Sequence, residues 1–150
     1  MRPDAPVVLV VDDDELVRDL LRIRLELDGL MPVVAKDGIE AMTLLSSHRP
    51  AAMLLDVSMP RMDGFQVLKT LRRTNRTPPP TLMLTARNAA EDVRKAIELG
   101  AKDFLAKPFN DQLLLRRVRR LLRPPPKPAP TPKAQVAPSA DTGSDRELFL

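Results

Sequence analysis

The chain has 150 residues, which is enough for one domain with a substantial core and a short appendage, but not for two domains of ordinary size. It contains no cysteine, which excludes disulfide bridges and thiolate metal sites. Its formal net charge is +4, no apolar run reaches the length of a membrane span, and no signal peptide is recognisable, so we expect a cytoplasmic protein without membrane contact.

Short apolar runs alternate with helix-like patterns five times along residues 1–123. The apolar runs predict strands at 7–11, 31–35, 52–55, 81–84 and 103–106. Apolar residues at helical spacing predict helices from about 15 up to Gly29, from 38 to about 48, from 65 to about 71, over 91–99 and over 111–122. Strict β-α alternation predicts a doubly wound α/β fold, in which five parallel strands carry helices on both faces.

Two of the predicted helices each concentrate one type of side chain, aliphatic in the first and arginine in the last. The first presents four aliphatic residues on one face, at Leu16, Leu20, Ile23 and Leu27. The last carries most of the positive excess, at Arg116, Arg117, Arg119, Arg120 and Arg123. A solvated helix face explains these arginines, and a surface for nucleic acid or an acidic partner is the alternative. Direct nucleic-acid binding is not expected, because no second helix would orient this one in a groove.

Residues 124–150 differ in character from the preceding domain at 1–123. Seven of the sixteen prolines lie in this tail, so it cannot bury enough apolar surface to fold and we expect an extended linker or tail. Its last residues, 148–150, are apolar again. They are compatible with the start of a further domain, with a docking peptide, or with no function.

Polar residues stand where four of the predicted strands stop, and they are Asp12, Asp13, Asp56, Thr85 and Lys107. The carboxyl ends of parallel strands share one edge of a sheet, where open α/β sheets bind ligands. Two carboxylates about 4 Å apart repel by roughly 4 kcal/mol at an effective dielectric near 20, so clustered acids need a cation or protons. Oxygen ligands favour Mg²⁺ or a similar ion such as Mn²⁺. Asp14 and Glu15 fit better at the positive end of the first helix.

Asp56 ends the most apolar strand and can attack phosphorus if a divalent ion and a lysine neutralise the phosphoryl oxygens. Lys107 can supply the ammonium, and Thr85 a hydroxyl donor. Taken singly, each residue also has an ordinary structural explanation. An aspartate can cap a helix or form a turn, a lysine can be a solvated charge, and a threonine can be an ordinary strand residue. A phosphatase with an aspartyl nucleophile is disfavoured, because Ser58 stands where its second carboxylate is needed. No glycine-rich phosphate loop supports nucleotide binding.

Four segments resemble the response-regulator receiver domains of two-component signalling, with order and spacing intact. They read VVLVVDDD at 7–14, LLDVSMPRMDG at 54–64, LTA at 84–86 and GAKDFLAKPF at 100–109. The resemblance covers residues 6–123 and implies a flavodoxin-like fold with strand order 2-1-3-4-5.

The resemblance also implies a role for each site residue. The ligands of Mg²⁺ or Mn²⁺ would be Asp12, Asp13, Asp56 and the backbone carbonyl of Ser58. Asp56 would accept a phosphoryl group from a phosphohistidine on a sensor histidine kinase or a histidine phosphotransfer protein. Lys107 would bind a phosphoryl oxygen, and the Lys107-Pro108 bond would be cis. The chain would catalyse only the gain and loss of its own phosphoryl group.

Thr85 and Phe104 would form a switch, in which Thr85 turns toward the phosphoryl group and Phe104 fills the space it leaves. Ser58 and Arg87 would tune the lifetime of the phosphoryl group. The output face would comprise the helix 91–99, the strand 103–106 and the helix 111–122. On this face, one ion pair of the dimer formed by DNA-binding regulators is kept, at Asp103 and Arg117, whereas Val93 and Leu113 stand in place of charged partners.

The sequence therefore predicts a signalling module whose phosphorylation controls contact with a downstream protein or a second copy of itself. The alternative is the N-terminal receiver part of a larger regulator, whose DNA-binding or enzymatic output domain is absent from this chain.

Overall fold

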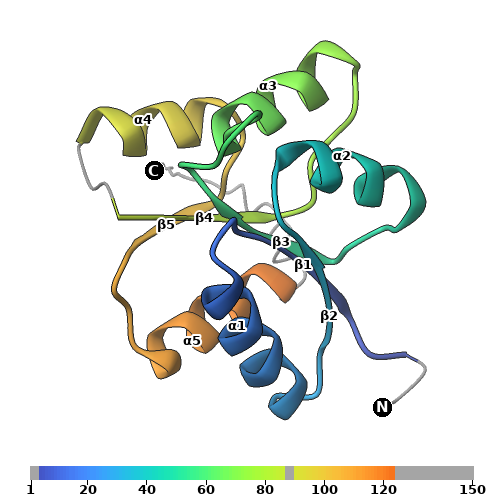
Figure 1. Ribbon diagram of the computed structural model, residues 1–150, viewed down its shortest axis with the longest axis vertical. Coiled ribbons are helices and arrows are strands. Elements are labelled where there is room, and N and C mark those ends of the chain that lie inside the picture. Colours follow the sequence, from blue (N-terminus) through green and yellow to red (C-terminus); the bar gives the residue numbers. More distant parts are fainter. Residues whose placement is uncertain (1–3, 87–89, 124–150) are drawn as a thin grey trace, which may run out of the picture.

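The computed structural model describes residues 4–86 and 90–123, and it folds them into three layers with a parallel sheet in the middle (Figure 1). The strands pair in the order β2-β1-β3-β4-β5. Their bounds are Val7–Val11 (β1), Met31–Ala35 (β2), Ala52–Asp56 (β3), Thr81–Thr85 (β4) and Asp103–Ala106 (β5). The helices are Glu15–Leu27 (α1), Gly38–Ser47 (α2), Gly64–Arg73 (α3), Ala90–Glu98 (α4) and Asp111–Leu122 (α5). The predicted doubly wound α/β fold and its strand order are confirmed.

Helices α1 and α5 cover one face of the sheet, and α2, α3 and α4 cover the other (Figure 1). Strands β3 and β4 are buried along their whole length between these layers, which is why their sequences are almost continuously apolar. No helix within the described ranges is long and apolar enough to cross a membrane. The predicted proline-rich tail at 124–150 and the predicted lifetime residue Arg87 lie outside the described residues.

Helix α1 is apolar on two sides, and only one of them packs on the sheet. Its inward side consists of Leu21 and Leu25, which are buried, and Val17, which is partly buried. The aliphatic face that the sequence pattern singles out is the other side, and it is exposed to solvent. A helix with two apolar stripes can pack on a sheet through either of them. Helical periodicity in the sequence therefore does not reveal which stripe faces inward.

Some element ends differ from the sequence prediction by one residue. Asp56 and Thr85 are the last residues of β3 and β4 rather than the first residues beyond them. Helix α4 spans Ala90–Glu98 rather than 91–99, because the chain reverses at Gly100, where φ is 106°. Asp56 and Thr85 are therefore held in regular β geometry, whereas Asp12, Asp13 and Lys107 follow the ends of β1 and β5.

Gly64 begins α3 directly against the end of β3. A Cβ atom at this position would lie 2.4 Å from the backbone carbonyl oxygen of Asp56, which cannot rotate away. We therefore expect Gly64→Ala to lower the free energy of unfolding by about 1–3 kcal/mol, as overpacking does. Chemical denaturation measures this loss. Gly29→Asn is the control, because its side chain would enter open space at a φ of 82° that asparagine tolerates. Equal stability of Gly64→Ala and the wild type would contradict the prediction.

Candidate functional site

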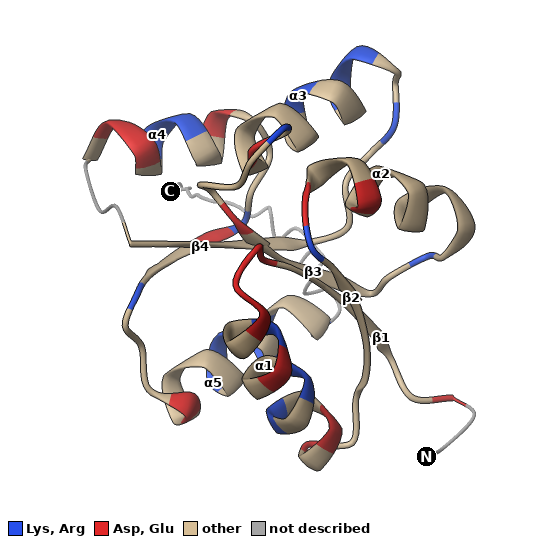
Figure 2. Cartoon of the chain, viewed as in Figure 1, with Lys and Arg blue, Asp and Glu red and all other residues tan. Residues whose placement is uncertain are grey.

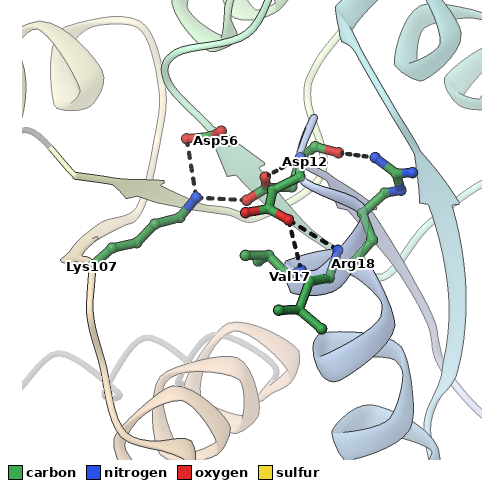
Figure 3. Close-up of polar contacts among 7 residues, drawn as sticks. Asp12, Val17, Arg18, Asp56 and Lys107 are labelled. Carbon is green, nitrogen blue, oxygen red and sulfur yellow. Dashed lines mark hydrogen bonds and ion pairs between the residues drawn. The ribbon is translucent and has the colours of Figure 1, made fainter.

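The carboxyl ends of β1, β3 and β5 bring charged side chains together at one edge of the sheet. Lys107 Nζ lies 2.7 Å from Asp12 Oδ2 and 3.6 Å from Asp56 Oδ1, so one ammonium contacts two carboxylates (Figure 3). Carboxylate oxygens of Asp12, Asp13 and Asp56 all lie within 4.8 Å of one another. Lys107 and Asp12 are 95 positions apart in the chain, and they meet because both follow strands of one parallel sheet.

The turn between β1 and α1 fixes the orientation of Asp12. This turn is acidic along its length (Figure 2). Asp12 Oδ1 accepts a hydrogen bond from the backbone N–H of Asp14 at 2.9 Å, and the Asp12 carbonyl accepts one from Arg18 Nη1 at 2.8 Å. The Asp14 carboxylate accepts hydrogen bonds from two backbone N–H groups of the first helical turn. Asp14 therefore caps α1, as its position in the sequence predicts.

Burial and neighbouring acids raise the pKa of Asp56 to about 7. Desolvation is the largest cause, and the negative charges of Asp12 and Asp13 add to it. The Lys107 ammonium and the Ser58 backbone amide act in the opposite direction. Because Asp56 is only 4 % exposed, water screens these interactions little. Asp56 is therefore a carboxylate whose negative charge is poorly compensated by its surroundings.

Lys107 stays positively charged because of the acids that it contacts. Burial works to lower its pKa, but the hydrogen bond and charge of Asp12 and the charge of Asp56 outweigh burial and raise the pKa. The backbone N–H of Lys107 donates to the Thr85 carbonyl at 2.7 Å, which extends the β4–β5 pairing to the edge of the site. The Lys107-Pro108 peptide bond is cis, as the resemblance implies.

The acidic cluster suits a hard divalent cation. Its potential ligands are carboxylate oxygens, which is the donor type that Mg²⁺ and Mn²⁺ favour. Burial is the main cause of the raised pKa of Asp56, and the negative charges of Asp12 and Asp13 add to it. A cation bound between these acids would offset both effects, because it compensates the buried charge and relieves the repulsion. Asp12, Asp13 and Asp56 therefore fit such an ion, and the Ser58 carbonyl stays a predicted further ligand.

The side chains of Thr85 and Phe104 point to the same face of the sheet. Thr85 is aligned with Ala106 across the β4–β5 pair, and Phe104 precedes Ala106 by two residues. Thr85 is buried, and Phe104 is half-buried against the core on the side of α2, α3 and α4. Ser58 is exposed, two residues beyond Asp56. The switch and lifetime roles of these residues stay predictions.

Two cationic contacts around the site have no clear sequence signal. Arg18 donates to the Asp12 carbonyl, and Arg61 pairs with the carboxylate of Asp37. The pKa of Asp37 is lowered, first by the hydrogen bond that it accepts from the Glu40 N–H at the start of α2, and then by Arg61. The Arg61 pair joins the loop after β3 to α2 across 24 positions, a separation that no local pattern encodes.

Part of the arginine-rich helix α5 is committed to contacts within the chain. Arg117 Nη1 lies 2.8 Å from Asp103 Oδ1 at the start of β5, and Arg119 pairs with Asp28 after α1. These two arginines fix α5 to its neighbours. Their contacts favour the structural interpretation of the cluster over a surface for nucleic acid.

A family model described as a response regulator receiver domain matches residues 8–119. The chain belongs to this family. Response regulator MprA of Mycobacterium sp. (strain KMS) is 46% identical to the receiver domain over 116 residues, and the match covers 77% of this chain and 50% of MprA. MprA of Mycobacterium bovis (strain BCG / Pasteur 1173P2) gives the same identity and coverage. The chain thus spans about half the length of the curated relatives that it matches.

Solved structures agree with the family. The receiver domain is similar to chemotaxis protein CheY4 of Vibrio cholerae, with 33% identity, a TM-score of 0.73 and coverage of 79% of this chain and 99% of CheY4. It is also similar to the Francisella response regulator 1452 receiver domain, with 34% identity, a TM-score of 0.73 and coverage of 78% and 96%. The resemblance noted in the sequence is confirmed. Receiver domains interact with histidine kinases and generally bind Mg²⁺ in an acidic pocket.

Proposed function

We propose that this receiver domain accepts a phosphoryl group on Asp56 from a phosphohistidine, in a reaction that requires Mg²⁺ or Mn²⁺. The donor is a sensor histidine kinase or a histidine phosphotransfer protein. The phosphoryl group alters the face formed by α4, β5 and α5, and so controls contact with a downstream protein or a second copy of the chain. The observation that carries this proposal is the placement of Lys107 between Asp12 and Asp56, in a cluster of acids at the strand ends.

Phosphoryl transfer exchanges one bond to phosphorus for another. An Asp56 carboxylate oxygen attacks phosphorus, so that an O–P bond forms while the P–N bond to the donor imidazole breaks, and the leaving nitrogen takes up a proton. Lys107 Nζ, 3.6 Å from Asp56 Oδ1, is placed to donate to a phosphoryl oxygen. Attack of water on the same phosphorus later restores the carboxylate and releases inorganic phosphate. The chain turns over no other substrate.

The residues around Asp56 bind and orient the participants. A bound divalent cation supplies positive charge to the phosphoryl oxygens and to the clustered acids. Asp12, Asp13 and Asp56 would hold it through carboxylate oxygens, and Ser58 through its carbonyl. The hydrogen bonds from Arg18 and from the backbone N–H of Asp14 keep Asp12 in position for this role.

The experiment that tests this function is incubation of the full chain with Mg²⁺ and acetyl phosphate, followed by intact mass measurement. We expect an acid-labile phosphoryl adduct on the wild type, none on Asp56→Asn, and none without the metal. Asp19→Asn, which alters an exposed carboxylate on α1, is the matched control and should retain the adduct. An unmodified wild type, or an equal adduct on Asp56→Asn, would overturn the proposal.

Removal of the Thr85 hydroxyl is expected to separate phosphoryl acceptance from its effect on the output face. Thr85→Ala leaves Asp56 and Lys107 in place, so the adduct should form at about the wild-type yield. The change in amide hydrogen exchange over residues 90–106 on phosphorylation should fall by more than about half, because the hydroxyl no longer follows the phosphoryl group. Thr81→Ala is the control, since Thr81 is also buried on β4 but lies at its other end. A full exchange response in Thr85→Ala would count against the switch.

A second candidate is that the chain is the receiver part of a larger regulator. The observation that favours it is the coverage of MprA, of which the match occupies only half. By resemblance to DNA-binding regulators, Asp103 and Arg117 would form an ion pair between the two copies of a dimer. In this structure the two residues pair within one chain. A longer reading frame that encodes a DNA-binding or enzymatic domain after residue 150 would support this candidate.

A further inference from the structure

Helix α1 exposes a row of large aliphatic side chains along its outer side, Leu16, Leu20, Ile23 and Leu27, which we call the α1 stripe. Their exposed fractions are 66, 55, 45 and 74 %. The other exposed large hydrophobic residues in the described part of the chain, Ile39 and Ile97, stand singly on α2 and α4. A continuous apolar row of this kind is typical of an interaction surface, whereas single exposed aliphatic residues are ordinary.

The α1 stripe has the spacing of a seam between two helices. Its members follow one another at intervals of four, three and four residues, which are the d and a positions of a heptad. Leu16 and Ile23 occupy d positions, and Leu20 and Leu27 occupy a positions. Leu21 and Leu25, on another side of α1, pack against the core between α1 and the sheet, so the α1 stripe is left exposed.

The charges beside the α1 stripe complement those of a second α1 laid parallel to it. Asp19 occupies a g position and Arg24 the e position five residues later, and in a parallel pair these two positions meet across the seam. Each Asp19 would face Arg24 of the other copy, twice by symmetry. Antiparallel pairing would instead bring Asp19 against Glu26, two like charges.

Both charged residues can reach a partner. Asp19 is exposed, and its one ion pair among the described residues is a 3.6 Å contact with Arg22, which is weak at the surface. The Nε atom of Arg24 lies 3.1 Å from Asp111 Oδ2, which leaves the outer guanidinium nitrogens for a second carboxylate.

We infer that the α1 stripe is a self-association surface that joins two copies of this chain through parallel α1 helices. This inference goes beyond the proposed function, because it requires no phosphoryl group and places the contact on α1 rather than on the face formed by α4, β5 and α5. The two acidic sites would lie at the same end of the dimer, since α1 follows Asp12 and Asp13 in each copy. The seam spans about three helical turns, and a contact of this length buries less than the roughly 1,200–2,000 Å² that stable interfaces bury. The dimer should therefore be weak, and its population should depend on concentration.

Sedimentation equilibrium of the full, unphosphorylated chain tests the surface. The mass should rise with concentration from the monomer value of 16.7 kDa toward twice that value. Leu20→Glu should stay monomeric over the same range, whereas Ile97→Glu, which places the same charge on an equally exposed aliphatic position, should behave like the wild type. A wild type that is monomeric at every concentration, or equal effects of the two variants, would overturn the inference and leave the stripe to a different partner.

A charge exchange tests the parallel arrangement. Asp19→Arg and Arg24→Asp should each weaken the dimer by about tenfold, because each places like charges across the seam. The double variant Asp19→Arg/Arg24→Asp restores opposite charges and should recover most of the wild-type affinity. If the double variant is as weak as the single variants or weaker, the parallel pairing is wrong.

Discussion

Asp56→Asn is expected to make the metal-free receiver domain more stable than the wild type at pH 8, by about 2–4 kcal/mol. Asp56 is buried at the end of β3, and its pKa is raised to about 7, so at pH 8 folding keeps a negative charge away from water and close to Asp12 and Asp13. Asparagine has nearly the same shape without the charge. The contact of Lys107 with Asp12 remains in the variant.

The pH dependence follows from the two pKa values of this one group. The pKa of Asp56 is about 7 in the folded state, and in the unfolded state it has its ordinary value of 3.8. Between these values the folded state holds a proton that the unfolded state has released. The stabilisation by this proton is complete below the unfolded pKa and is lost as the pH rises to about 7, which amounts to at most about 4 kcal/mol. The gain from Asp56→Asn should therefore be greatest above pH 7 and vanish near pH 4.

Urea denaturation of both proteins with a chelator, at pH 5 and at pH 8, measures this effect. Mg²⁺ should stabilise the wild type at pH 8 more than Asp56→Asn, because the cation relieves the repulsion that the variant already lacks. Glu98→Gln, at an exposed carboxylate at the end of α4, is the control for loss of one carboxylate. A metal-free Asp56→Asn protein that is no more stable than the wild type at pH 8 would show that Asp56 is adequately compensated by its surroundings.

The fold and most of the site can be predicted from sequence for a simple reason. Parallel strands with continuous apolar sequence must be covered on both faces, and their carboxyl ends share an edge. Any polar residue that ends such a strand, such as Asp56 or Thr85, therefore faces that edge. The cluster of Asp12, Asp56 and Lys107 follows once the strand order is known, and that order is implied by the resemblance to receiver domains rather than by the apolar pattern.

Other features depend on packing that a local pattern does not encode. The stripe of Leu20 and its neighbours has helical periodicity, but α1 has a second apolar side at Leu21 and Leu25, and the sheet selects that one. The contact of Arg61 with Asp37 depends on how the loop after β3 folds back on α2. Such contacts are properties of the folded chain and cannot be deduced from any one segment of the sequence.

Lys107→Met is expected to change the stability of the metal-free protein in the direction opposite to Asp56→Asn. Methionine keeps the aliphatic volume but removes the ammonium that lies 2.7 Å from Asp12 Oδ2 and 3.6 Å from Asp56 Oδ1. Removal of one partner from a buried ion pair costs about 3–5 kcal/mol. We expect a loss of about 3 kcal/mol at pH 8, and a further rise in the pKa of Asp56, because Lys107 works to lower it. Lys102→Met, at an exposed lysine just before β5, is the control.

The double variant Lys107→Met/Asp56→Asn separates the two carboxylates that Lys107 contacts. If the ammonium stabilises the fold through both, the cost of Lys107→Met should be smaller in the Asp56→Asn background, with a coupling energy of about 1–3 kcal/mol at pH 8. The coupling should shrink at pH 5, where Asp56 in the metal-free protein is protonated. Strictly additive losses at pH 8 would mean that Lys107 acts on stability through Asp12 alone. In that case its 3.6 Å contact with Asp56 would matter only once a phosphoryl group is present.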